Sequence, residues 1–360
     1  MSDPDRRLTR RDFLRLGVLA PALPPLLSGA LSACFKREKE NAVNFFNWSA
    51  YIGKDTLPAF SRETGIKVNY DVYADEEEMF AKLRSGALGY DLIVPTDYLV
   101  PRLKAAMLIA PIPMEGLKNL HNIDKRFLHT PFDPQQEISV PYLWGTTGIG
   151  YNKKLVSKPP TSWRALWDEK YQGRICVLDS ARECIGISLL LNGCDENTTS
   201  EKDFEAAKAL LLKQKPLVKQ YTSTTYVDSL VAGEAALAMA YSGDVLQAIK
   251  ENPHLDYIIP QEGSFLWMDC LCLMRGAPHP EQALQLIDYL LRPEVSADIS
   301  NTVRYGTPNA SARSQIEPTL RHDPRCYPPS SVMSRLRYHT PPDSEAYSLW
   351  NETWSDVKAL

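Results

Sequence analysis

The chain has 360 residues, of which 44% are hydrophobic and 23% charged, a composition that excludes a largely disordered protein and leaves room for two domains. The formal net charge is −4. Because nucleic-acid binding usually needs a basic surface, no nucleic-acid partner is expected, whereas an acidic protein suits a cationic ligand.

The first 33 residues are predicted to direct export rather than to fold. Residues 9–14 (TRRDFL) indicate a twin-arginine signal, and an apolar stretch follows from about Leu16 to Leu31. The prolines in this stretch and its short length argue against a permanent membrane helix. It ends in LSAC, which resembles a bacterial lipoprotein cleavage site and would make Cys34 the lipid attachment point. The alternative is an ordinary cleaved signal with a chance cysteine, and both interpretations place the protein outside the cytoplasm.

Residues 34–42 are polar and are predicted to tether the lipid to the folded part. Strand and helix patterns then alternate, which is typical of a parallel α/β sheet with helices on its faces. The acidic run 75–78 is expected to be the solvated start of a helix, where negative charge suits the helix dipole. The predicted strands are 43–48, 66–70, 90–95, 174–178, 235–241 and 267–273. The predicted helices are 54–64, 75–85, 204–214, 281–291 and about 344–357.

Six cysteines remain beside Cys34, at positions 176, 184, 194, 270, 272 and 326. An oxidising compartment permits disulfides, and the pairing stays open. A twin-arginine substrate folds in a reducing cytosol, so the fold is not expected to depend on disulfides. Buried, unreactive thiols are the favoured interpretation.

Aromatic and carboxylate residues recur where predicted strands end. In open α/β sheets, ligands bind beyond the carboxyl ends of the strands, so these residues predict a cleft. They stand at Trp48, 96–98, 179–180, 241–244 and 267–269.

Eight ordered motifs carry a family resemblance. They are 46–51 (FNWSAY), 63–68 (ETGIKV), 90–98 (YDLIVPTDY), 140–146 (VPYLWGT), 162–167 (SWRALW), 178–183 (LDSARE), 265–269 (FLWMD) and 305–309 (YGTPN). In these motifs, over roughly residues 43–315, the chain resembles the bacterial spermidine/putrescine-binding periplasmic proteins, which serve polyamine ABC transporters. The resemblance implies an α/β, two-lobed periplasmic binding protein fold of type II, with the ligand cleft between lobes that close by hinge bending. By analogy, lobe 1 is 43–143 plus 269–315, and lobe 2 is 144–268 plus 316–360.

The resemblance also implies a set of ligand-binding residues. Carboxylates would bind ammonium groups by charge-assisted hydrogen bonds, and aromatic faces would cover the methylene spacers and attract the cations. The aromatic walls would be Trp48, Tyr51, Tyr98, Trp267, Tyr305 and Tyr241, where the family has a tryptophan. The carboxylates would be Glu183, Asp244 and Asp269, and Ser49 would supply a hydroxyl.

Several of these positions have other interpretations. Glu183 could pair with Arg182 or cap a helix, and Asp244 could cap the helix that begins near Val245. The family commonly has acidic residues where this chain has Ala50 and Ser180, and Asp97 is a candidate replacement.

These departures weakly favour a shorter diamine over spermidine. Another small amine or a zwitterion is the alternative ligand. Residues 335–338 offer no secure match for the family's late glutamine contact.

The leading hypothesis is therefore a monomeric receptor that binds a polyamine and docks on the permease of an ABC importer. A polyamine-sensing module, a lipoprotein hydrolase and a metal-binding protein are the alternatives. The chain has no GxSxG, no HExxH and no glycine-rich phosphate loop, and its histidines lack metal-ligand spacing, so no enzyme activity, metal or cofactor is expected.

Overall fold

A computed structural model describes residues 41–86, 89–339 and 344–359. The predicted export signal and Cys34 lie outside these residues. Within the described ranges, no helix is both long and apolar enough to cross a bilayer.

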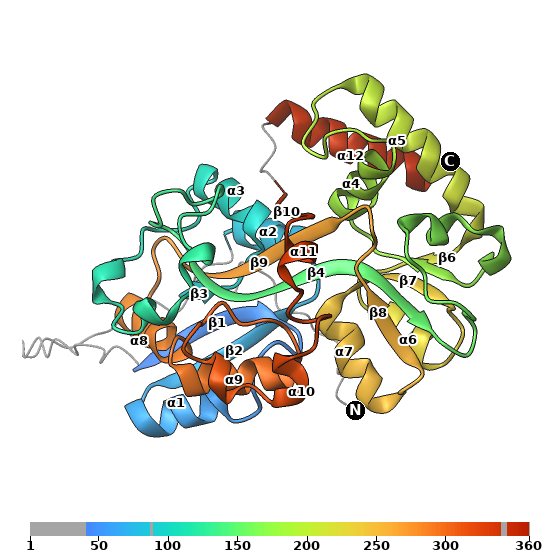
Figure 1. Cartoon of the computed structure of the whole chain (residues 1–360). Coiled ribbons are helices and arrows are strands. Elements are labelled where there is room, and N and C mark those ends of the chain that lie inside the picture. The colour runs from blue at the N-terminus through green and yellow to red at the C-terminus, as the bar shows by residue number, and fades with distance from the viewer. Residues whose placement is uncertain (1–40, 87–88, 340–343, 360) are drawn as a thin grey trace, which may run out of the picture. The chain divides into compact units, whose positions relative to one another are not determined.

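The first hydrophobic core surrounds three parallel strands, with β1 between β2 and β3. The strands are β1 (Ala42–Trp48), β2 (Lys67–Tyr73) and β3 (Leu92–Ile93). Helix α8 packs on β1 and α1 packs on β2, as Figure 1 shows. The helices of this half are α1 (Thr56–Thr64), α2 (Glu76–Arg84), α3 (Val100–Ala105), α8 (Pro280–Leu290) and α9 (Pro293–Val303).

The second core surrounds another parallel trio, with β5 between β6 and β7. The strands are β5 (Ile175–Val177), β6 (Val218–Tyr221), β7 (Leu237–Tyr241) and β8 (Leu255–Ile258), of which β8 pairs with β4. Helix α12 packs on α4 and α5. The helices are α4 (Ala181–Leu191), α5 (Glu201–Gln214), α6 (Tyr226–Val231), α7 (Ser242–Glu251) and α12 (Ser344–Ala359).

Two long antiparallel strands, β4 (Val140–Asn152) and β9 (Ser264–Leu273), run from one core to the other (Figure 1). Both are buried along their whole length, although β4 contains Thr146 and Thr147 and β9 contains Asp269. The parallel order expected from the sequence holds for β1 to β3 and for β5 to β7. It is wrong for β9, which pairs antiparallel with β3, and β4 also pairs antiparallel with β7 and β8. β4 was not among the strands predicted from the sequence, and only residues 267–273 of β9 were, so the antiparallel pairing of the two was not predicted either.

A third, small cluster packs α7 of the second core against α9 of the first. It consists of Leu246, Ala297, Ala312, Ile316, Leu320 and Cys326. The chain then continues through α10 (Pro318–Arg321) and α11 (Ser330–Met333) to β10 (Leu336–Arg337), which pairs with the start of β9.

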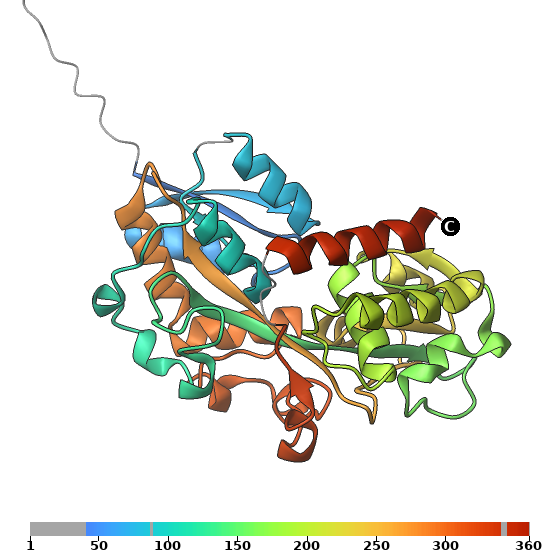
Figure 2. The same ribbon diagram turned by 90° about the horizontal axis from the view of Figure 1, so that it is seen from above.

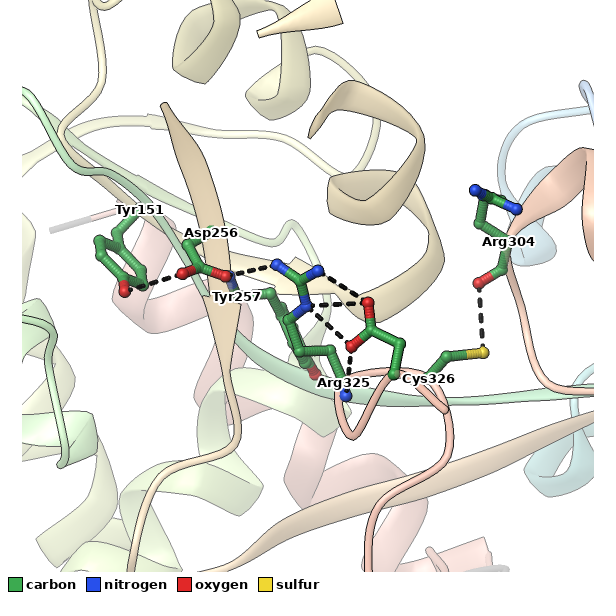
Figure 3. Close-up of polar contacts among 7 residues, drawn as sticks. Tyr151, Asp256, Tyr257, Arg304, Arg325 and Cys326 are labelled. Atoms are coloured by element: carbon green, nitrogen blue, oxygen red, sulfur yellow. Dashed lines mark hydrogen bonds and ion pairs between the residues drawn. The ribbon is translucent and has the colours of Figure 1, made fainter. Parts of the chain in front are cut away.

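The segment 323–326 ties the two halves together (Figure 3). Arg325 lies 2.6 Å from Asp256 on β8 and 2.7 Å from Asp323. The adjacent Cys326 donates its Sγ–H to the carbonyl of Arg304, directly after α9, at 3.5 Å. All six described cysteines are free thiols, and all but Cys194 are buried, as the sequence favoured.

Candidate functional site

A cavity of about 610 Å³ lies between the two cores, a size typical of small-molecule sites. All ten residues proposed from the sequence as ligand contacts line it. They are Trp48, Ser49, Tyr51, Tyr98, Glu183, Tyr241, Asp244, Trp267, Asp269 and Tyr305.

Most of these side chains lie at the end of a strand or shortly after it, as expected. Trp48 is the last residue of β1, and Tyr241 is the last of β7. Tyr98 follows β3, and Glu183 lies in the first turn of the helix after β5. The carboxyl ends of strands from both cores therefore meet at the cavity.

Trp267 and Asp269 were predicted at a strand end, and this is wrong. They lie in the middle of β9, which begins at Ser264 and continues to Leu273. Alternate residues of a strand point to the same face, so both can line the cavity while Met268 is buried in the first core. The crossing strand itself thus forms part of the site.

The aromatic walls pack against one another mainly edge to face. The Trp267 ring lies 5.6 Å from Tyr241 and 5.2 Å from Tyr305, and Tyr305 lies 5.5 Å from Tyr51. Gly145 makes room for this group, because a Cβ there would lie 2.6 Å from the Trp267 ring.

Asp269 is held by neutral donors. The Tyr51 hydroxyl donates to it at 2.5 Å and the Thr96 hydroxyl at 3.0 Å. Burial raises the pKa of Asp269 to about 7, and the neighbouring charge of Glu76 contributes to the increase. A cation beside this carboxyl group would favour its ionised form.

Asp244 bridges the two halves. Its carboxylate accepts hydrogen bonds from Tyr226 of α6 at 2.6 Å and from Tyr305 at 2.5 Å, and burial raises its pKa. It lies inside α7, whose N-cap is Tyr241 with no side-chain cap bond, so the capping alternative for Asp244 is wrong.

Glu183 lies near the buried His339, which was not predicted from the sequence to be part of the site. Its Oε1 is 3.7 Å from His339 Nε2, and within the described residues its Oε2 has no hydrogen-bond partner. His339 stacks on Phe265 at 3.9 Å, and burial, aided by the charge of Arg182, lowers its pKa, which favours the neutral ring. The capping role on α4 belongs to Ser180, which accepts from the Glu183 amide at 3.4 Å.

The acidic run 75–78 is not uniformly solvated, which corrects the expectation from the sequence. Asp75, Glu77 and Glu78 are exposed, but Glu76 is only 6% exposed and lines the cavity. Its Oε1 accepts the Thr96 amide at 2.7 Å, it also bonds the Tyr98 hydroxyl, and burial raises its pKa. The sequence did contain a sign of this burial. Glu76 precedes the buried Met79, Phe80 and Leu83 by three, four and seven residues, a spacing that places all four on one face of the helix.

Asp97 does not replace the missing carboxylates. It is fully buried, and it accepts the amides of Tyr98 at 2.6 Å and Met268 at 3.1 Å, so it fastens β9 to the segment after β3. Ala50 is exposed with a φ of 53° and is not among the residues that line the cavity, whereas Ser180 is.

One face of α12 lines part of the cavity. Seen from above, the helix lies over α4 and α5 of the second half (Figure 2). The sequence predicted this helix but not its place in the site. Tyr347 donates to Glu77 of α2 at 3.0 Å, and so links the helix to the first half. The face consists of Tyr347, Trp350, Asn351, Trp354 and Lys358.

No group of three or more histidine, cysteine, aspartate or glutamate residues that could hold a metal occurs in the described part of the chain.

Comparison with known proteins agrees with this geometry. Residues 56–325 match the family model of the bacterial extracellular solute-binding proteins. The spermidine/putrescine-binding periplasmic protein of Salmonella typhimurium is 35% identical over 339 residues, covering 93% of this chain and 97% of the relative. The putrescine-binding periplasmic protein of Pseudomonas aeruginosa is 33% identical over 355 residues, covering 92% and 96%.

A solved structure is also similar. The spermidine/putrescine ABC transporter substrate-binding protein of Streptococcus pneumoniae superposes with a TM-score of 0.79 at 29% identity, covering 88% of this chain and 98% of that one. The two-lobed fold and the expectation of a binding protein rather than an enzyme are confirmed by these relatives. The chain therefore belongs to the family of bacterial extracellular solute-binding proteins, alongside the spermidine/putrescine-binding periplasmic proteins.

Proposed function

We propose that this protein captures a polyamine outside the cytoplasm and delivers it to the permease of an ABC importer. One observation carries the proposal: a cavity between the two cores combines buried carboxylates with aromatic walls. A polyamine requires both, because its ammonium groups need anionic acceptors and its methylene spacers need apolar cover. The names of the Salmonella and Pseudomonas relatives support the same ligand class.

The ligand contacts in this proposal are the ten residues expected from the sequence. Glu183, Asp244 and Asp269 bind ammonium groups, and the tyrosines and tryptophans enclose the spacers. Ser49 adds a hydroxyl at the rim. Asp244 and Tyr305 come from different halves of the molecule, so their hydrogen bond supports closure of the lobes around the ligand.

In this proposal lobe 1 is 43–143 plus 269–315 and lobe 2 is 144–268 plus 316–360. Strands β4 and β9 form the hinge between them.

The protein acts as a monomer, is exported by the twin-arginine route and is anchored through a lipid on Cys34. Replacing Cys34 with serine should move the protein from the membrane fraction to the soluble fraction. Retention in the membrane would remove Cys34 as the anchor.

Uptake of labelled putrescine and spermidine tests the delivery step. A strain that lacks its chromosomal copy is complemented with the wild type or with Asp269→Asn. Uptake at low external concentration should return only with the wild type. Equal uptake with and without the protein would contradict a transport role.

A further inference from the structure

Thr96 holds two carboxylates of the cavity at once. Its amide donates to Glu76 at 2.7 Å, and its hydroxyl donates to Asp269 at 3.0 Å. Glu76 is 6% exposed and Asp269 is 4% exposed, and both line the cavity. One residue therefore contacts both acids, although one lies on α2 and the other on β9, and the charge of Glu76 acts on Asp269.

The hydrogen bonds that Glu76 and Asp269 accept within the described residues come from uncharged groups. Glu76 bonds the Thr96 amide and the Tyr98 hydroxyl, while Asp269 bonds the hydroxyls of Tyr51 and Thr96. Two like charges that are buried together repel each other, and neutral hydroxyls offset only part of that energy. A cation placed between the two carboxylates would remove the repulsion.

The same cavity holds other buried polar atoms without partners in the described part of the chain. These include Trp267 Nε1 and Glu183 Oε2, and both side chains are more than nine-tenths buried. Buried donors and acceptors are normally satisfied, so these atoms independently point to a bound polar ligand.

We propose that Glu76 and Asp269 together form a two-carboxylate subsite for one protonated primary amine, with Glu76 as a specificity-determining residue. The inference rests on the proposed function and adds Glu76 to it. A primary ammonium has three N–H donors and can bond both carboxylates at once. A quaternary ammonium has no N–H donor, so the subsite distinguishes primary ammonium groups from quaternary ones.

Replacing Glu76 with glutamine tests the role of the charge, because the glutamine oxygen can still accept the Thr96 amide. We expect putrescine affinity, measured by calorimetry, to fall by roughly 30-fold or more. The melting temperature of the ligand-free variant should stay the same or rise. Glu78→Gln is the matched control, since Glu78 is an exposed residue of the same helix, and it should leave affinity unchanged.

The double variant Glu76→Gln with Asp269→Asn shows whether the two acids share one ammonium. Sharing predicts that the combined loss is clearly smaller than the product of the two single losses. Independent, multiplicative losses would overturn the shared subsite.

Should the variants fold poorly, the fully methylated quaternary analogue of putrescine tests the wild type directly. Binding of this analogue as tight as that of putrescine would also overturn the inference.

The outcomes separate the two proposals. If the wild type binds no polyamine, the proposed function fails. If the wild type binds putrescine and Glu76→Gln binds it within about threefold of the wild type, only the role of Glu76 fails. A loss of affinity accompanied by a lower melting temperature that Glu78→Gln does not share would make Glu76 a structural residue.

Discussion

The hydroxyl of Tyr51 donates to Asp269 at 2.5 Å, although the two residues are 218 positions apart in the sequence. The bond joins the turn after β1 to the middle of the crossing strand β9. The bond holds Asp269 in one orientation, which would reduce the entropy lost on binding the proposed ammonium group.

Asp269→Asn is expected to weaken polyamine binding by roughly 2–5 kcal/mol, because it removes one charge from a buried charge-assisted contact. Titration calorimetry measures the change. Asp55→Asn is the control, since Asp55 forms an exposed pair with Arg62 at 2.6 Å that should not affect the ligand. Equal affinities of the wild type and Asp269→Asn would remove Asp269 from the site.

Polyamine binding should release a proton near neutral pH. With the pKa of Asp269 raised to about 7, roughly half of the ligand-free molecules hold a proton there at pH 7. A bound ammonium favours the ionised form, so affinity should rise from about pH 5 to about pH 8. The raised pKa values of Glu76 and Asp244 act in the same direction.

Calorimetry in buffers of different ionisation enthalpy counts the protons released. The other ionisable groups facing Asp269 are Tyr51, Tyr73, Tyr142, Asp97 and Glu76. Burial raises the pKa of each of the three tyrosines, so their hydroxyls stay protonated between about pH 5 and about pH 8. Asp269→Asn should reduce the number of protons released. Proton uptake by the wild type would contradict the assignment.

Gly145→Ala should disturb the aromatic wall. The new Cβ would lie 2.6 Å from the Trp267 ring and 3.0 Å from the Tyr305 ring, so both side chains must shift. Overpacking of this kind typically costs about 1–3 kcal/mol, and we expect polyamine affinity to fall about tenfold. Gly116→Ala is the control, because its Cβ would meet no atom within 4 Å. Unchanged affinity in Gly145→Ala would show that the position of the Trp267 ring does not matter.

Arg325→Met should loosen the tie between the two halves. It leaves Asp256 and Asp323 without the guanidinium that both contact, and we expect a loss of about 1–3 kcal/mol in the free energy of unfolding. Arg126→Met removes an exposed pair with Asp124 and should change stability by less than about 1 kcal/mol. Denaturant unfolding compares the two variants, and equal losses would contradict a special role for Arg325.

Strand ends and motif residues were predictable because they depend on local patterns. Trp48 and Tyr241 are the last residues of their strands, and their place at the cavity follows from the geometry of a parallel sheet. The antiparallel path of β9 was not predictable from its residues. The predicted strand began at Trp267, whereas β9 begins at Ser264, so Asp269 was expected near a strand end rather than within the strand.

Glu76 and His339 show what local patterns miss. The burial of Glu76 depends on Thr96 and Tyr98, which lie about 20 residues further along the chain, so four consecutive acidic residues looked solvated. His339 belongs to no motif, and its place depends on stacking against Phe265 of β9. In both cases a tertiary contact, rather than the residue's own segment, brings the side chain to the cavity.

Titration calorimetry of the purified protein with putrescine, cadaverine, agmatine and spermidine tests the central claim most directly. The account predicts saturable binding of at least one of these amines with one ligand per chain, and no binding of the uncharged analogue 1,4-butanediol. An absence of heat and of any thermal stabilisation with all four amines would contradict polyamine capture.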